Sequence, residues 1–559
     1  MALSSHNILL LLSSVLIFSA CTTDNSENIE ESSETISVDI KNRTLVNKAA
    51  NIPSQCYTKT EDDNGVIHNP CFNCHISAKI PNYVDDWDFQ EIYPFREYTL
   101  ENHWTNLFKD RTQEISKIDD VSILNYIREN NYIGADGKLL LAEKLNNLSE
   151  EWDIDSDGKW DGYIPDCYFN FDNEGFDKNL DNEYTGWRAF GYYPFLGTFW
   201  PTNGSTDDVL IRLPEVFREN NDGQFDLDTY KVNLLIVESL IKQKDIKTDP
   251  IDESKYDVDL DKDGKIGIAY QITFEYDPIN GKNMSYVGNA SKQNEMIAAG
   301  LYPVGTEFLH TVRYLDIDNN NSVKMSARLK ELRYGKKVSW FSYSDHKLVY
   351  DQEMQDLRAF PDRLAVFIGD AERGLSNNRG WRYQGFIEDQ KGELRPQTYE
   401  ENLNCIGCHS SLGALADSTF VFQRKFENDT FQNGWFHWSQ KGFEGIAEPK
   451  TPDGRDEYVL YLQENGAGDE FRSNSEIKEK FFDENGSLIT DEVKKFHTDI
   501  SYLLLPSTQR ALILNKAYKI IVDEQSFIYG RDGHVEPVEN VHRQLDRDQR
   551  TKISNPVRY

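Results

Sequence analysis

Two five-residue runs with one pattern constrain this chain of 559 residues more than any other feature. The first run is Cys71–His75 (CFNCH), and the second is Cys405–His409 (CIGCH). The whole chain contains only 7 Cys and 11 His, so two copies indicate a shared function rather than coincidence.

The C-x-x-C-H pattern is typical of covalent attachment of c-type haem, in which the cysteines form thioethers and the histidine binds the iron. Two alternatives exist. A structural zinc site would require the two Cys pairs to converge on one ion, but it would not require a histidine after each pair. A thioredoxin-like redox pair would require a βαβ context, which neither run has. We therefore predict haem attachment at Cys71, Cys74, Cys405 and Cys408, with His75 and His409 as proximal iron ligands.

On these two motifs the chain resembles the c-type cytochromes, and the resemblance covers only the motifs. It implies two covalently bound haem c groups, attached outside the cytoplasm. It also implies haem regions that are rich in helices and loops and contain little sheet.

The two copies share a second feature. His103 lies 28 residues after His75, and His437 lies 28 residues after His409; each is followed by Trp and a hydroxyl residue. Because haem iron takes a sixth ligand unless that face stays open, His103 and His437 are predicted as distal ligands. The alternative is a His-Trp packing pair at a haem edge, and the competing ligands are His68, His310, His346 and Met354.

The first 21 residues predict export. An apolar run ends at Ser19-Ala20-Cys21, which resembles a lipoprotein signal with Cys21 as the lipidated residue. Plain secretory cleavage is the alternative. The predicted location is the periplasm or the outer membrane, with a lipid anchor in the membrane and redox proteins of the envelope as partners. A net charge of −34 argues against nucleic acid as a partner.

The predicted fold class is α+β and multidomain, with helical, loop-rich haem regions flanking a strand-rich centre. Helices are predicted near 121–131, 139–148, 227–243 and 507–522, and strands near 209–213, 266–276, 307–315, 323–329 and 338–343. The predicted divisions are a signal peptide (1–21), an acidic tether (22–44), a first haem region (45–150), the strand-rich centre (151–400), a second haem region (401–500), and a terminal helix and tail (501–559).

Two acidic loops resemble the start of an EF-hand. Alternating acids followed by glycine are typical of calcium loops, although neither loop has the glutamate expected at position 12. The alternative is an acidic turn that faces water. The candidate calcium ligands are Asp153, Asp155, Asp157 and Asp161 in the first loop, and Asp259, Asp261 and Asp263 in the weaker second loop.

Two cysteines, Cys56 and Cys167, remain after the motifs and Cys21 are assigned. In an oxidising compartment they could form a disulfide, and buried free thiols are the alternative.

Two functions fit these observations. The first is an electron carrier with two haems, each held between two histidines. The second is a di-haem peroxidase or oxygenase, which would need one open iron and polar groups beside it. The equal spacing of the histidines favours the carrier, and the long central insertion favours the enzyme.

Overall fold

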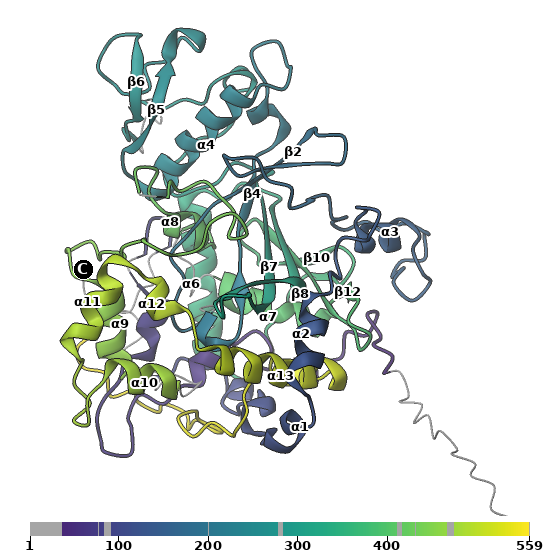
Figure 1. The fold of residues 1–559 in the computed structure, drawn as a ribbon. Helices are drawn as coiled ribbons and strands as arrows, with labels where there is room; N and C mark the ends of the chain where they lie inside the picture. Colours follow the sequence, from purple (N-terminus) through teal and green to yellow (C-terminus); the bar gives the residue numbers. More distant parts are fainter. Residues whose placement is uncertain are drawn as a thin grey trace, which may run out of the picture. The chain divides into compact units, whose positions relative to one another are not determined.

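The computed structural model describes residues 36–76, 78–82, 91–198, 201–277, 283–410, 416–430, 432–466 and 474–557. A ten-stranded antiparallel sheet organises them, in the order β1-β2-β4-β7-β8-β11-β10-β9, with β3 paired to β7 and β12 to β11 (Figure 1). Its strands are β1 Phe176–Lys178, β2 Tyr184–Ala189, β3 Thr206–Asp207, β4 Leu210–Arg212, β7 Glu307–Ile317, β8 Val323–Lys337, β9 Gly369–Asp370, β10 Gly374–Ser376, β11 Trp381–Glu388 and β12 Leu394–Pro396. A separate hairpin pairs β5 (Ile246–Asp252) with β6 (Ile268–Ile272).

The α-helices surround the sheet: α1–α3 precede it in the chain, α4–α6 lie between its strands, and α7–α13 follow it. They are α1 Thr112–Ser116, α2 Asp120–Arg128, α3 Leu140–Asn146, α4 Leu227–Lys242, α5 Asn289–Lys292, α6 Tyr343–Ala359, α7 Tyr399–His409, α8 Val421–Arg424, α9 Glu457–Asn465, α10 Ser475–Phe481, α11 Thr490–Thr498, α12 Ser501–Leu504 and α13 Thr508–Glu524. Among the described residues, every helix is too short or too polar to cross a bilayer.

The predicted fold class was wrong. Instead of helical cytochrome-like regions around a strand-rich centre, one large sheet dominates, and both C-x-x-C-H segments belong to the unit that contains it, Ser37–Tyr559. The reason is that sheet neighbours are distant in sequence: β4 pairs with β7 after the whole of α4 and the β5–β6 hairpin. Local residue patterns identify strands but do not identify partners this far apart.

Alternation along the strands gives the sheet two buried faces. On β7, Phe308 packs in one apolar cluster with Trp381 and the side chains of α4, whereas its neighbour Leu309 packs in a second cluster with Trp187. Successive side chains of a strand point to opposite faces, so β7 contributes to both clusters.

Two asparagines, one after α2 and one on α13, attach these helical segments to the sheet. Register shifts at Arg313 and Leu315 interrupt the β7–β8 ladder. There the amide of Asn515, on α13, donates to the Leu315 carbonyl (2.7 Å) and accepts from its N–H (3.2 Å). Asn131, after α2, makes the same pair of bonds to Leu329 on β8, at 2.9 Å each. Each side chain replaces backbone partners that the irregular ladder does not supply.

A buried carboxyl reinforces this junction. Glu388 on β11 accepts hydrogen bonds from the hydroxyls of Tyr126 (2.8 Å) and Tyr314 (2.6 Å), and from Arg328 (3.1 Å). Burial is the largest influence and raises the pKa of Glu388 to about 7. Between its ordinary pKa and this value, the folded protein holds a proton that the unfolded chain releases. Stability therefore falls as pH rises through this window.

Glu388→Gln is expected to remove this pH dependence. Between pH 5 and pH 7.5 the unfolding free energy of the wild type should fall, relative to the variant, by about 2.4 kcal/mol, because each unit of pKa shift corresponds to 1.36 kcal/mol and most of the titration lies in this range. Urea unfolding at both pH values measures it. Glu129→Gln is the control, since Glu129 contacts the same Arg328 at the surface. Parallel curves for wild type and Glu388→Gln would contradict the prediction.

Candidate functional site

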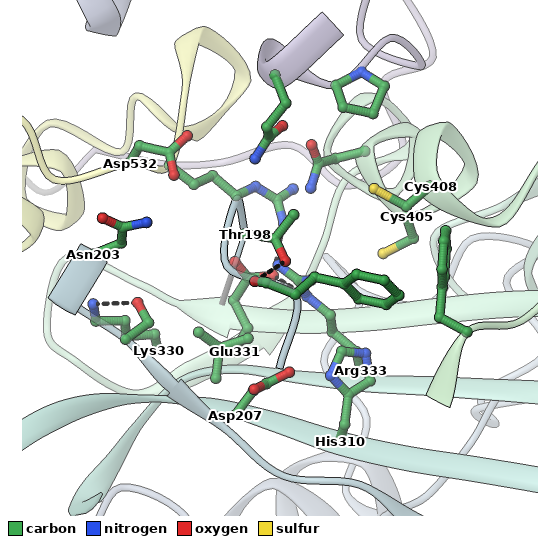
Figure 2. Close-up of a pocket in the computed structure, with 18 of the residues that line it drawn as sticks. Thr198, Asn203, Asp207, His310, Lys330, Glu331, Arg333, Cys405, Cys408 and Asp532 are labelled. Atoms are coloured by element: carbon green, nitrogen blue, oxygen red, sulfur yellow. Dashed lines mark hydrogen bonds and ion pairs between the residues drawn. The ribbon is translucent and has the colours of Figure 1, made fainter. Parts of the chain in front are cut away.

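A cavity lies against one face of the sheet (Figure 2). Its empty space is about 1800 Å³ when the part open to solvent is counted. The sheet contributes His310 and Val312 from β7, and Glu331, Arg333 and Gly335 from β8. These positions alternate along each strand, as residues on one face do, and Lys330 and Tyr334 of β8 also border the cavity.

Both predicted haem motifs reach this cavity. Cys405, Cys408 and His409 line it from the last turns of α7, and Cys74 lines it from the N-terminal segment. Residues 334 positions apart in the sequence therefore border one space.

The helix that carries the second motif has a well-defined start. The Thr398 side chain accepts from the backbone N–H of Glu401, and the Glu401 carboxylate accepts from the backbone N–H of Thr398, which forms a capping box. Arg395 holds the same carboxylate with two bonds of 2.8 Å. These contacts fix α7, and therefore its C-terminal motif, relative to the sheet.

The His409 imidazole is oriented like a metal ligand. Its Nδ1 donates to the backbone carbonyl of Ser418 (3.0 Å), so Nε2 carries the lone pair. The Tyr383 ring stacks on it with centroids 4.6 Å apart. Burial lowers the pKa of His409 to about 4, which keeps the ring neutral at pH 7. This geometry satisfies the requirement for a proximal ligand.

A buried ion pair holds the turn that orients His409. Asp417 and Ser418 both adopt positive φ, at 47° and 60°. Asp417 is paired with Lys337 of β8, both side chains are fully buried, and the same carboxylate accepts from the backbone N–H of Tyr302 (2.9 Å). Neither Asp417 nor Lys337 was predicted from the sequence, because nothing local links position 337 to position 417.

The first motif packs beside the second. It begins in a 3-10 turn, Pro70–Asn73, and the N–H of His75 donates to the Cys71 carbonyl (3.0 Å). Gly407 of the second motif lies against the Asn51 carbonyl, where an added Cβ would approach to 2.8 Å. This close approach brings α7 against the N-terminal segment.

Cys56 lies between the two motifs. Burial raises the pKa of its thiol, and the nearby Cys74, Cys71 and Cys408 raise it further. Cys167 has different neighbours: it is fully buried in the second apolar cluster, and after burial the largest influence on its pKa is Asp177. Both cysteines are free thiols in the structure, which does not bring the predicted disulfide partners together.

The structure also bears on the zinc alternative. In the described part of the chain, the groups of metal-ligating atoms that lie within 4.8 Å of one another contain no cysteine. Tetrahedral zinc requires thiolates gathered around one ion. Cys74 of the first pair and both cysteines of the second pair border the cavity without converging in this way, which favours two separate attachment sites.

The sheet wall of the cavity is polar. Glu331 accepts from Arg333 (2.9 Å) and from Arg531 (2.6 Å). Burial opposes ionisation of Glu331, yet these two arginines lower its pKa to about 2. Asp207 of β3 bonds the Tyr192 hydroxyl, and burial raises the pKa of Asp207 to about 8. The wall therefore combines an ionised Glu331 paired with two arginines and a protonated Asp207.

The proposed distal ligands occupy different settings. His103 lies 3.7 Å from Glu101 and is 25% exposed; its neighbour Trp104 lines the cavity. The two ring nitrogens of His437 are engaged elsewhere: Nε2 bonds Asp208 (2.9 Å), and Nδ1 accepts from the Ser439 hydroxyl (2.7 Å). In this arrangement His437 has no ring nitrogen directed to a metal.

The structure brings together some of the predicted calcium ligands of the acidic loops, but not all of them. Asp153, Asp155 and Asp157 place ligand atoms within 4.8 Å of one another. Asp161 instead bonds Arg373 (2.9 Å), which also contacts Asp155.

In the second loop Glu253 joins Asp259 and Asp261 in a similar group, without Asp263. Sequence reasoning missed Glu253. It is buried and accepts from the backbone N–H groups of Leu260 and Gly267, so the fold brings it into the loop.

Calcium binding at the first loop predicts a stabilisation that chelation removes. At a free Ca²⁺ concentration 100 times Kd, the unfolding free energy should rise by about 2.7 kcal/mol. Thermal unfolding with Ca²⁺ and with EDTA measures the effect. Asp155→Asn should abolish it, and Asp483→Asn, in an ordinary exposed turn, should not. No difference in the wild type would mean that Arg373 alone neutralises the loop.

Comparison with known proteins assigns the chain to a family. The sequence profile of a lipoprotein family matches residues 40–499, which is most of the chain. This chain belongs to that lipoprotein family. It is also 31% identical to an uncharacterized lipoprotein of Aquifex aeolicus (strain VF5), over 95% of this chain and 92% of the relative. No solved structure matches it significantly.

Membership in a lipoprotein family indicates export and a lipid anchor in the membrane, which agrees with the predicted localisation. The predicted anchor, Cys21, and most of the predicted tether lie outside the described residues. Membership in this family does not by itself identify a cofactor.

Proposed function

We propose that this lipoprotein is a di-haem c-type cytochrome that transfers electrons in the cell envelope, with both haems bound at the one cavity. The observation that carries this proposal is that the two C-x-x-C-H motifs border the same space, with His409 fixed by its Nδ1–H bond to a backbone carbonyl. The haems supply one-electron chemistry; the chain holds, orients and shields them.

The residues of the cavity fit a planar group that carries carboxylates. Gly335 lies on the floor between β7 and β11, where an added Cβ would come within 2.9 Å of the Tyr383 ring. Its missing side chain lets the Tyr383 ring, which stacks on His409, lie close to the sheet. Arg333 and Arg531 line the same cavity. Both also bond Glu331, and their further N–H groups would pair with haem propionates, since guanidinium groups favour carboxylates.

The arrangement suits electron transfer. Sharing one cavity would keep two haems close, and rigid surroundings limit rearrangement when the iron changes charge. For the first haem we propose His75 and His103 as the two iron ligands. Envelope redox proteins are the proposed partners, reached from a membrane surface to which the lipid anchor holds the protein.

A second candidate function is a di-haem peroxidase or oxygenase. The polar wall formed by Asp207, Glu331 and Arg333 favours it, because such enzymes need polar groups beside an open iron. The two functions differ in whether one iron accepts an external ligand.

Binding of an external ligand distinguishes the two functions. For the carrier, the oxidised protein should show two low-spin haems, and neither cyanide nor peroxide should change its absorption spectrum. The dithionite-reduced protein should also pass electrons rapidly to a soluble oxidised cytochrome in stopped-flow mixing. A high-spin haem that binds cyanide and reacts with peroxide would favour the enzyme and contradict the carrier.

A further inference from the structure

The wall opposite the second motif contains a histidine that the spacing of the motifs does not indicate. His310 is part of β7, lines the cavity together with His409, and pairs across the sheet with Arg333 of β8. Figure 2 shows His310 next to Arg333 on the sheet side of the pocket, with Cys405 and Cys408 on another wall.

The register of the sheet places the two imidazoles on one face. Tyr383, which stacks on His409, pairs with Gly335, and Gly335 pairs with Phe308. His310 follows Phe308 by two residues, so its side chain rises from the same face. Strands β7 and β11 are separated only by β8, which places them about 10 Å apart.

His310 is also in the right chemical state to bind a metal. Its Nδ1 is buried without a hydrogen-bond partner among the described residues. Burial, then Arg333 and His409, lower the pKa of His310 to about 3, so the ring is neutral and keeps its lone pair at pH 7. His437 differs from His310 in this respect, because both of its ring nitrogens already have hydrogen-bond partners.

We infer that His310 is the sixth ligand of the haem iron held by His409. This inference rests on the proposed function, because it requires haem at Cys405 and Cys408. His310 then replaces His437 in that role. His437 instead has a structural function: its bond to Asp208 holds the segment after α8 against β3 and β7, because Asp208 also bonds Thr311 of β7.

The test compares His310→Ala with the matched control His437→Ala by electron resonance and absorption spectroscopy of the oxidised proteins. His310→Ala should convert one of two low-spin haems to high spin, and added imidazole should restore the low-spin spectrum. His437→Ala should keep two low-spin haems. His310→Met provides a second variant in case the alanine protein does not fold; it should remain low-spin but acquire the absorption band of methionine-ligated iron.

The outcomes separate this inference from the proposed function. Two low-spin haems in His310→Ala would overturn the inference, and loss of one in His437→Ala would return the role to His437. A His310→Met spectrum identical to that of the wild type would also overturn it. By contrast, wild-type protein without covalently bound haem would overturn the proposed function itself.

Discussion

Replacing Cys405 and Cys408 together by serine is expected to remove one of two covalently bound haems and to leave the other. Thioether attachment requires these two sulfurs, and the first motif has its own pair, Cys71 and Cys74. The haem content per chain, measured by absorption of the alkaline pyridine complex, should fall by half. The corresponding Cys71 and Cys74 variant should show the same loss.

The matched control is Cys56→Ser. Cys56 lies beside Cys71, Cys74 and Cys408 but belongs to no C-x-x-C-H motif, so its loss should leave two haems. Loss of both haems from either double variant in properly folded protein would show that attachment is interdependent. Unchanged haem content in both double variants would contradict covalent attachment at these motifs.

Lys337→Met is expected to cause the largest loss of stability. It removes the Lys337 ammonium from the fully buried Asp417 carboxylate, which keeps the His346 ring (3.3 Å) and the Tyr302 N–H (2.9 Å) as neighbours. Breaking a buried ion pair costs about 3–5 kcal/mol. Because Asp417 precedes Ser418, whose carbonyl orients His409, the spectrum of the second haem should also change. Urea unfolding and electron resonance measure the two effects.

Two variants make this prediction specific. Arg547→Met, which breaks a surface pair with Glu97, should lower the unfolding free energy by less than about 1 kcal/mol and leave both haem signals unchanged. Lys337→Met combined with Asp417→Asn removes both charges and should recover part of the stability. A stable Lys337→Met protein with an unaltered second haem would contradict the proposed role of the pair.

The elements that the sequence revealed are those with strong local patterns. The predicted helix 227–243 corresponds to α4, and the predicted strands 307–315 and 323–329 correspond to β7 and β8. The predicted strand 338–343 is not a strand: β8 ends at Lys337, and α6 begins at Tyr343 after a Ser342 cap. The β-branched and aromatic residues of this segment favoured a strand, but the Ser342 cap starts a helix instead.

The site was only partly predictable for a related reason. The motif residues can be recognised from their spacing in the sequence. The cavity, however, depends on residue pairs such as His310 with Arg333, and the sheet register that creates these pairs cannot be read from the sequence. The equal spacing of His103 and His437 indicated symmetry between the copies. The structure places these two histidines in different surroundings, because the segments that follow the motifs pack against different elements.

We propose that this exported protein carries two covalently attached haems at its two C-x-x-C-H motifs. The most direct measurement is the intact mass of the denatured wild-type protein, produced in a host that matures c-type cytochromes. We expect the mass of the processed polypeptide plus two haems, retained after acid and organic extraction. A mass equal to the polypeptide alone, or to the polypeptide with a removable metal ion, would contradict it.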